Sequence, residues 1–201
     1  MQKIVDYLRS KYQPETIIVY GSFADGSNGP GSDFDALLLT DHMETNHDDS
    51  VVDGKPLDVF LYPTDAQLDP SDFPQLYHCK LVHDTCGKGR QLIDRAVNAI
   101  ENRPMKTKAE ILDNLSWCDK MLHRTQRGDA EGYYRWHWVL CDSLEYYCDI
   151  RGKFYFGPKK TLQWMQQEDP EAFLIYSEAL SCLEWEKLKS WVKYLRSQME
   201  G

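Results

Sequence analysis

Apolar and polar positions follow clear periods along the first half of the chain. Residues 2–12 carry apolar side chains at helical spacing, and two apolar runs typical of buried strands follow at 16–20 and 34–40. Asp53-Gly54, between two further apolar or β-branched runs, is a strong β-hairpin signal. With residues 80–84 as a last strand, this half is predicted to form an α/β (α+β) fold around a mixed sheet.

Two stretches of this half predict irregular structure. Residues 41–50 are acidic and polar, which is typical of a loop. The stretch that ends near residue 75 is rich in proline and aspartate, so we expect irregular chain with a short helix there.

The pattern becomes helical from residue 88 onward, and after Arg103-Pro104 it stays helical to the end of the sequence. The expected helices of this second half are 106–126, 130–151, 158–167, 170–182 and 184–198. We therefore divide the chain into an α/β domain over residues 1–103 and an all-α bundle over residues 104–201.

Composition limits the classes of partner and location. The formal net charge of -9 argues against a surface that tracks a long nucleic acid, because such surfaces need lysine and arginine. No apolar run reaches the roughly 20 residues that span a bilayer, so we expect no membrane segment. Six cysteines without a C-x-x-C pair, and an N-terminus without a signal-peptide core, favour a cytoplasmic location over disulfide pairing in a secreted protein.

Two aspartates stand where the second apolar run begins. Asp33 and Asp35 are two residues apart, so on an extended strand their side chains point to the same face. Asp58 interrupts the apolar run after the hairpin and joins them if that run lies beside residues 34–40. Three carboxylates at one place repel one another unless a cation neutralises them, and oxygen-only clusters suit Mg²⁺ or Mn²⁺.

Gly21-Ser22 follows the first strand and precedes a predicted short helix. Glycine lets backbone N–H groups approach an anion, and the start of a helix favours negative charge. A nucleoside triphosphate fits both features, because metal ions can bridge its oxygens to the carboxylates.

Gly21-Ser22, Asp33-Phe34-Asp35 and Leu57-Asp58-Val59, in this order, resemble the signature of the polymerase-β-type nucleotidyltransferase superfamily. They are most similar to its small bacterial members, the minimal nucleotidyltransferases and the kanamycin and lincosamide nucleotidyltransferases. The motif covers residues 17–62, and the arrangement of two domains extends a weaker likeness over the rest. One departure is that family members often have an arginine soon after the Gly-Ser pair, where this chain has Phe23-Ala24-Asp25-Gly26.

The resemblance implies transfer of a nucleoside monophosphate, with AMP favoured, from its triphosphate to a hydroxyl of a small molecule, with antibiotics as one class of acceptor. By position in the motif, the residues that hold the phosphates are Gly21 and Ser22, and the catalytic Mg²⁺ ligands are Asp33, Asp35 and Asp58. The first domain is then catalytic, and the helical domain binds the acceptor or docks a partner. The kanamycin relatives complete their sites as dimers, which favours a homodimer.

The helical half supplies further candidates. Pro158 predicts a helix start with Lys159 and Lys160 in the first turn, where the helix dipole disfavours cations, so we expect one of them to reach the triphosphate. Glu145 lies three residues after Asp142 on a predicted helix and is the candidate general base for the acceptor hydroxyl.

Each candidate also has a structural alternative. Asp33 could cap a turn, Asp35 could be an exposed strand-edge residue, and Asp58 could pair with Lys55 across the hairpin. The two lysines could simply be solvated, and the glutamate could form a surface salt bridge with Arg151 or another base. Two functional alternatives also stay open: a protein-modifying or antitoxin-like nucleotidyltransferase acting on a partner protein, and a non-catalytic nucleotide-binding relative.

Overall fold

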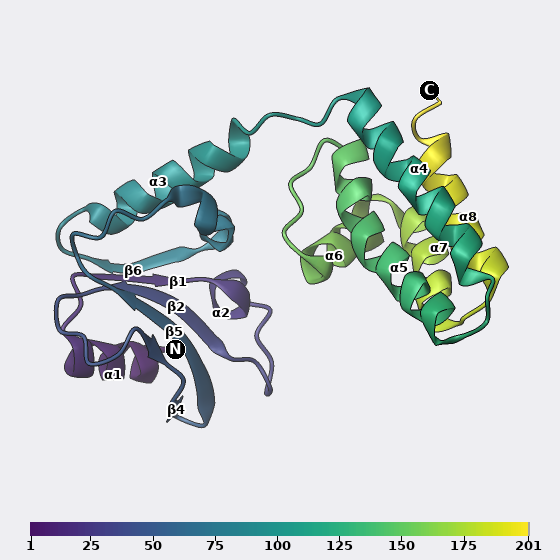
Figure 1. The fold of residues 1–201 in the computed structure, drawn as a ribbon. Helices are drawn as coiled ribbons and strands as arrows, with labels where there is room; N and C mark the ends of the chain where they lie inside the picture. The colour runs from purple at the N-terminus through teal and green to yellow at the C-terminus, as the bar shows by residue number, and fades with distance from the viewer. Residues whose placement is uncertain (201) are drawn as a thin grey trace. The chain divides into compact units, whose positions relative to one another are not determined.

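The computed structural model describes residues 1–200 and divides into two compact units, Met1–Arg103 and Pro104–Gly201. The first unit contains a mixed sheet with helices, and the second is built from helices (Figure 1). The predicted fold class is therefore confirmed.

A six-stranded sheet forms the centre of the first unit. Its strands are β1 (Thr16–Val19), β2 (Phe34–Leu39), β3 (His47–Asp48), β4 (Val51–Val52), β5 (Lys55–Tyr62) and β6 (Lys80–Asp84). The order across the sheet is β3-β5-β2-β1-β6, and β4 pairs with β5 through the predicted hairpin. β2 and β5 run parallel, whereas the other pairs are antiparallel.

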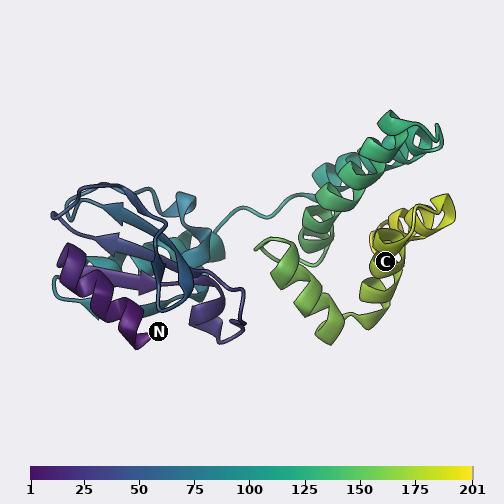
Figure 2. The same cartoon turned by 90° about the horizontal axis from the view of Figure 1, so that it is seen from below.

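Helices lie on both faces of this sheet. α1 (Gln2–Tyr12) packs on the face that contains Leu38, and α3 (Lys88–Glu101) packs on the face that contains Leu37. Figure 1 shows α1 and α3 on opposite sides of the sheet, and Figure 2, seen from below, has α1 in front of the strands. Because both faces are covered, neighbouring residues of a central strand can both be apolar, which explains the unbroken apolar run of β2.

The prediction of an uninterrupted loop over residues 41–50 is wrong. This stretch contains β3, in which His47 and Asp48 pair with the outer side of β5. A strand of two polar residues carries no apolar alternation, so its sequence resembles that of a loop. Its position depends instead on one side chain, the carboxylate of Asp48.

Asp48 lies under α1 and is only 4% exposed. Its carboxylate accepts a hydrogen bond from the Tyr12 hydroxyl at 2.7 Å and one from the Lys11 ammonium at 3.0 Å, both on α1. Burial alone would raise the pKa of Asp48, but hydrogen bonds from Ser50, Tyr12 and Lys11 outweigh it and hold the pKa well below its usual range. This network ties the edge of the sheet to the first helix.

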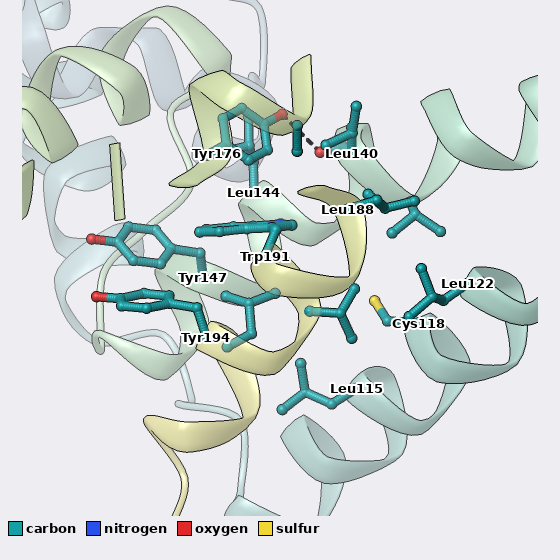
Figure 3. Packing of buried hydrophobic residues seen from close by; sticks show 14 of the residues in the cluster. Leu115, Cys118, Leu122, Leu140, Leu144, Tyr147, Tyr176, Leu188, Trp191 and Tyr194 are labelled. Carbon is teal, nitrogen blue, oxygen red and sulfur yellow. Dashed lines mark hydrogen bonds between the residues drawn. The ribbon is translucent and has the colours of Figure 1, made fainter. Parts of the chain in front are cut away.

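The second unit contains each of the five predicted helices, with ends within two residues of the predicted ones. They are α4 (Lys108–Thr125), α5 (Ala130–Ile150), α6 (Pro158–Glu168), α7 (Pro170–Ser181) and α8 (Trp185–Ser197). Trp191 of α8 is fully buried among them, with its ring beside Tyr147 and Tyr176 (Figure 3). Its indole N–H donates to the hydroxyl of Ser143 at 2.8 Å, so the buried polar atom is satisfied.

All six cysteines of the chain are free, and Cys86 and Cys141 are exposed. Burial raises the pKa of Cys118 to about 12, so this thiol stays protonated at neutral pH. Within residues 1–200, no helix is long and apolar enough to cross a bilayer.

We expect Asp48→Asn to lower the free energy of unfolding by about 2 kcal/mol at pH 7, because hydrogen bonds to a buried charge are lost. Since the folded-state pKa is depressed, the wild-type contribution is present above about pH 4 and is lost as the pH falls through the folded-state pKa. Urea unfolding of both proteins between pH 7 and pH 2.5 measures this difference. Asp49→Asn, at an exposed neighbour, is the control, and equal stability of the Asp48 variant and wild type across this range would contradict the assignment.

Candidate active site

Asp35 and Asp58 lie side by side on neighbouring strands. β2 and β5 pair in parallel with Asp35 directly opposite Asp58, so the two side chains extend from the same face of the sheet. Tyr20 directly follows β1, and burial first and then the charges of Asp58 and Asp35 raise the pKa of its hydroxyl. The expected position of the hairpin's second arm beside residues 34–40 is therefore confirmed.

Asp33 directly precedes β2 and is exposed. Within residues 1–200 its side chain makes no hydrogen bond or ion pair, so it does not cap the turn before it. That turn is closed by other groups, since the backbone N–H of Gly29 donates to the hydroxyl of Ser32 at 2.9 Å. The carboxylate is left available to a ligand.

Lys55 holds the glycine-rich segment in place. Its ammonium donates to the carbonyl oxygens of Gly29 and Pro30, at 2.9 Å and 2.7 Å. The alternative in which Lys55 pairs with Asp58 is therefore wrong. The reason is strand geometry: the two residues are three apart on β5, so their side chains leave opposite faces of the sheet.

Gly21 is packed directly against the carboxylate of Asp35. Its φ of 63° lies in the left-handed region, and a Cβ at this position would meet Asp35 Oδ2 at 2.3 Å. Gly21 and Ser22 begin the short helix α2 (Gly21–Asp25), which Phe23 anchors by an edge contact with Phe34 at 5.2 Å. Only glycine combines this backbone conformation with this approach to the carboxylate.

His47 is a functional candidate that the sequence did not suggest. Its Nε2 lies 2.8 Å from Asp58 Oδ1, and its ring packs against Phe60 with centroids 4.7 Å apart. In the sequence, His47 stands in a polar stretch eleven residues before Asp58 and has no metal-ligand spacing. Only the pairing of β3 with β5 reveals the contact.

A pocket of about 440 Å³ lies on the same face of the sheet as the two carboxylates. It contains Leu37 and Phe60, which stand two residues after Asp35 and Asp58 on the same face of their strands. The aromatic and acidic residues of its lining are Tyr20, Phe60, Tyr62, Phe73, Asp69 and Asp72. Aromatic rings with a few carboxylates suit a ring compound that carries hydroxyl or amino groups.

The donor chemistry of this site fits a divalent cation. Asp35 and Asp58 present carboxylate oxygens to one face, and Asp33 stands two residues before Asp35. Oxygen donors of this kind suit Mg²⁺ or Mn²⁺, which keep positions for water and substrate phosphate. Within residues 1–200, no three or more acidic, histidine or cysteine side chains are close enough to form a preformed metal site.

The remaining predicted residues belong to the second unit. Glu145 forms an ion pair with Lys106 at 3.3 Å rather than with Arg151. Lys159 and Lys160 stand in the first turn of α6, as predicted. The approach of these side chains to the carboxylates of the first unit stays a prediction.

Residues 1–85 match the model of the family described as nucleotidyltransferase domain. A solved toxin-antitoxin structure with AMP-PNP has 16% identity and a TM-score of 0.37, over 56% of this chain and 95% of that chain. A nucleotidyltransferase-like protein from Exiguobacterium sibiricum 255-15 has 13% identity and a TM-score of 0.43, over 99% of this chain and 72% of that chain. No curated protein matches the chain significantly.

The fold and the family match define the class as a transferase of phosphorus-containing groups. Residues 1–85, within the first unit, are similar to the nucleotidyltransferase domain family. The resemblance drawn from Gly21-Ser22 and the three aspartates is thus confirmed at the level of the family.

We expect Gly21→Ala to abolish nucleotide binding, because its Cβ would displace the carboxylate of Asp35. Gly26→Ala is the matched control: its φ of 81° imposes the same kind of backbone strain, about 1–2 kcal/mol, but a Cβ there meets no atom within 4 Å. Calorimetric titration with ATP and magnesium, together with thermal unfolding, compares the two. If both variants lose binding to the same extent, backbone strain rather than contact with Asp35 explains the effect.

Proposed function

We propose that this protein is a magnesium-dependent nucleotidyltransferase that moves a nucleoside monophosphate, with AMP favoured, from a nucleoside triphosphate to a hydroxyl of a small molecule. The observation that carries this proposal is the pairing of Asp35 with Asp58 on one face of the sheet, with Gly21 packed against Asp35. A carboxylate pair beside a glycine that begins a short helix is suited to holding a metal-bound triphosphate.

The transfer forms one bond and breaks another. The acceptor oxygen attacks the α-phosphorus while the bond from this phosphorus to the β,γ-pyrophosphate breaks, and pyrophosphate leaves with the electron pair. The hydroxyl proton passes to a base. In this scheme Asp58 helps to activate the acceptor oxygen, and Glu145 is the candidate for the final proton acceptor.

In this proposal, the candidate residues divide between binding of the metal and binding of the phosphates. Asp33, Asp35 and Asp58 would hold Mg²⁺ or Mn²⁺, which when bound neutralises the carboxylates and the charge on the phosphates. The backbone at Gly21 and the hydroxyl of Ser22 would bind phosphate oxygens. Lys159 or Lys160 would add the cation that the segment after Gly21-Ser22 lacks.

The pocket on the same face of the sheet as the carboxylates supports a small-molecule acceptor. Its volume of about 440 Å³ falls in the range of small-molecule sites, and its lining includes Phe60, two residues after Asp58 on β5. Carboxylates of Asp69 and Asp72 in the lining favour an acceptor with amino groups over an anionic one. An antibiotic that carries hydroxyl and amino groups is one compound class of this kind.

Calorimetric titration with ATP and GTP, each with and without Mg²⁺, tests the site without knowledge of the acceptor. We expect magnesium-dependent binding by the wild type and a loss of at least about tenfold in Asp35→Asn and in Asp58→Asn. Asp49→Asn, at an exposed position, controls for the change in net charge. Absence of binding by the wild type, or equal binding by all variants, would reject the proposal.

Kinetic measurements distinguish the two roles proposed for residues of the second unit, which are binding of the triphosphate and proton transfer. We expect Lys159→Ala/Lys160→Ala to weaken binding of the triphosphate, and Glu145→Gln to lower turnover while binding is unchanged, because a general base acts only in the chemical step. Pyrophosphate release in the presence of a panel of hydroxyl-bearing small molecules supplies the rates. Lys108→Ala, also in the first turn of a helix, is the matched control for lost charge.

The same panel distinguishes the proposal from its alternative. Pyrophosphate release that depends on a small molecule supports it. Release only after addition of a partner protein, with label from the nucleotide transferred to that protein, would replace the small-molecule acceptor with a protein while retaining the site.

A further inference from the structure

We propose that His47 is the residue that positions the carboxylate of Asp58. His47 would fix one oxygen of this carboxylate and leave the other directed to the metal and the acceptor. This inference rests on the proposed function, and it adds a residue that lies outside the Gly-Ser and aspartate motifs.

The direction of the hydrogen bond follows from the chemistry of its two partners. An ionised carboxylate only accepts hydrogen bonds, so the imidazole must donate its Nε2–H to Asp58 Oδ1 across 2.8 Å. Within residues 1–200, Asp58 makes no other hydrogen bond. Oδ1 is therefore committed to the histidine, and Oδ2 is available.

His47 is itself held on several sides. Its carbonyl oxygen accepts a hydrogen bond from the hydroxyl of Thr45 at 2.9 Å, and its ring packs against Phe60. Asp48, the next residue, points to the opposite face of the sheet and is buried under α1. Because the backbone, the ring and the neighbouring residue are all fixed, the imidazole is placed before any ligand arrives.

The carboxylate of Asp58 needs a hydrogen-bond partner to orient it, because packing does not confine this side chain. Its side chain is 44% exposed, whereas Asp35 is contacted by Gly21. A half-exposed aspartate without a partner samples several rotamers. Partners that orient a metal-binding carboxylate typically contribute 10–100-fold to metal affinity or activity.

His47→Leu and His47→Gln test the inference together. Leucine removes the donor, whereas glutamine places an amide N–H near the position of Nε2 and can still donate to Asp58. His42→Leu is the matched control, because His42 is exposed and its side chain makes no hydrogen bond within residues 1–200.

Two readouts separate positioning from stability. The first is binding of Mn²⁺, followed by electron paramagnetic resonance in the presence of a non-hydrolysable ATP analogue. The second is the rate of pyrophosphate release with an acceptor that the wild type uses. We expect His47→Leu to lose about 10–100-fold in Mn²⁺ affinity or kcat with KM for ATP nearly unchanged, and we expect His47→Gln to recover most of the loss.

The possible failures are distinguishable. If wild type binds Mn²⁺ and nucleotide and His47→Leu matches it, the role of His47 is refuted while the proposed function stands. A His47→Leu variant whose only defect is a lower melting temperature also refutes the positioning role. If wild type binds neither ligand, the proposed function fails, and the inference about His47 fails with it.

Discussion

The parallel register of β2 against β5 is the constraint on which the proposed site depends. Asp35 lies opposite Asp58 only because Phe34 pairs with Leu57 and the register continues without a shift along both strands. A slip of one residue would turn Asp58 toward α1 and bring Val59 to the face that carries Asp35, because successive side chains of a strand leave opposite faces. The slip would bury a carboxylate under α1 and remove apolar side chains from the core there, so this core enforces the alignment of the two acids.

Polar contacts at the ends of these strands also help to position the residues of the candidate site. Lys55 fixes the carbonyl oxygens of the glycine-rich segment that leads into Asp33, while Gly21 permits the chain to pass close to Asp35. On the outer side of β5, the buried carboxylate of Asp48 anchors a strand that would otherwise have little to hold it. The candidate site is thus built on a sheet, and its exposed side chains depend on neighbouring residues that hold them in place.

Local patterns were sufficient for much of this structure. Helical spacing identified the helices, and Asp53-Gly54 identified the hairpin. The contacts of His47 and Lys55 could not be predicted in this way, because their partners are distant in sequence. A two-residue strand is defined by what it pairs with, and its own residues carry too little information to specify it.

The brevity of β3 also bears on how copies of this protein can associate. β3 is an edge strand, and edge strands expose unsatisfied backbone groups that can recruit a strand from another molecule. With only His47 and Asp48 in the ladder, and with the Asp48 carboxylate already engaged by α1, this edge offers too few backbone groups for stable addition of a further strand. The sheet therefore resists growth into an intermolecular ribbon on this side, and of its two edges the longer strand is β6 at the opposite end.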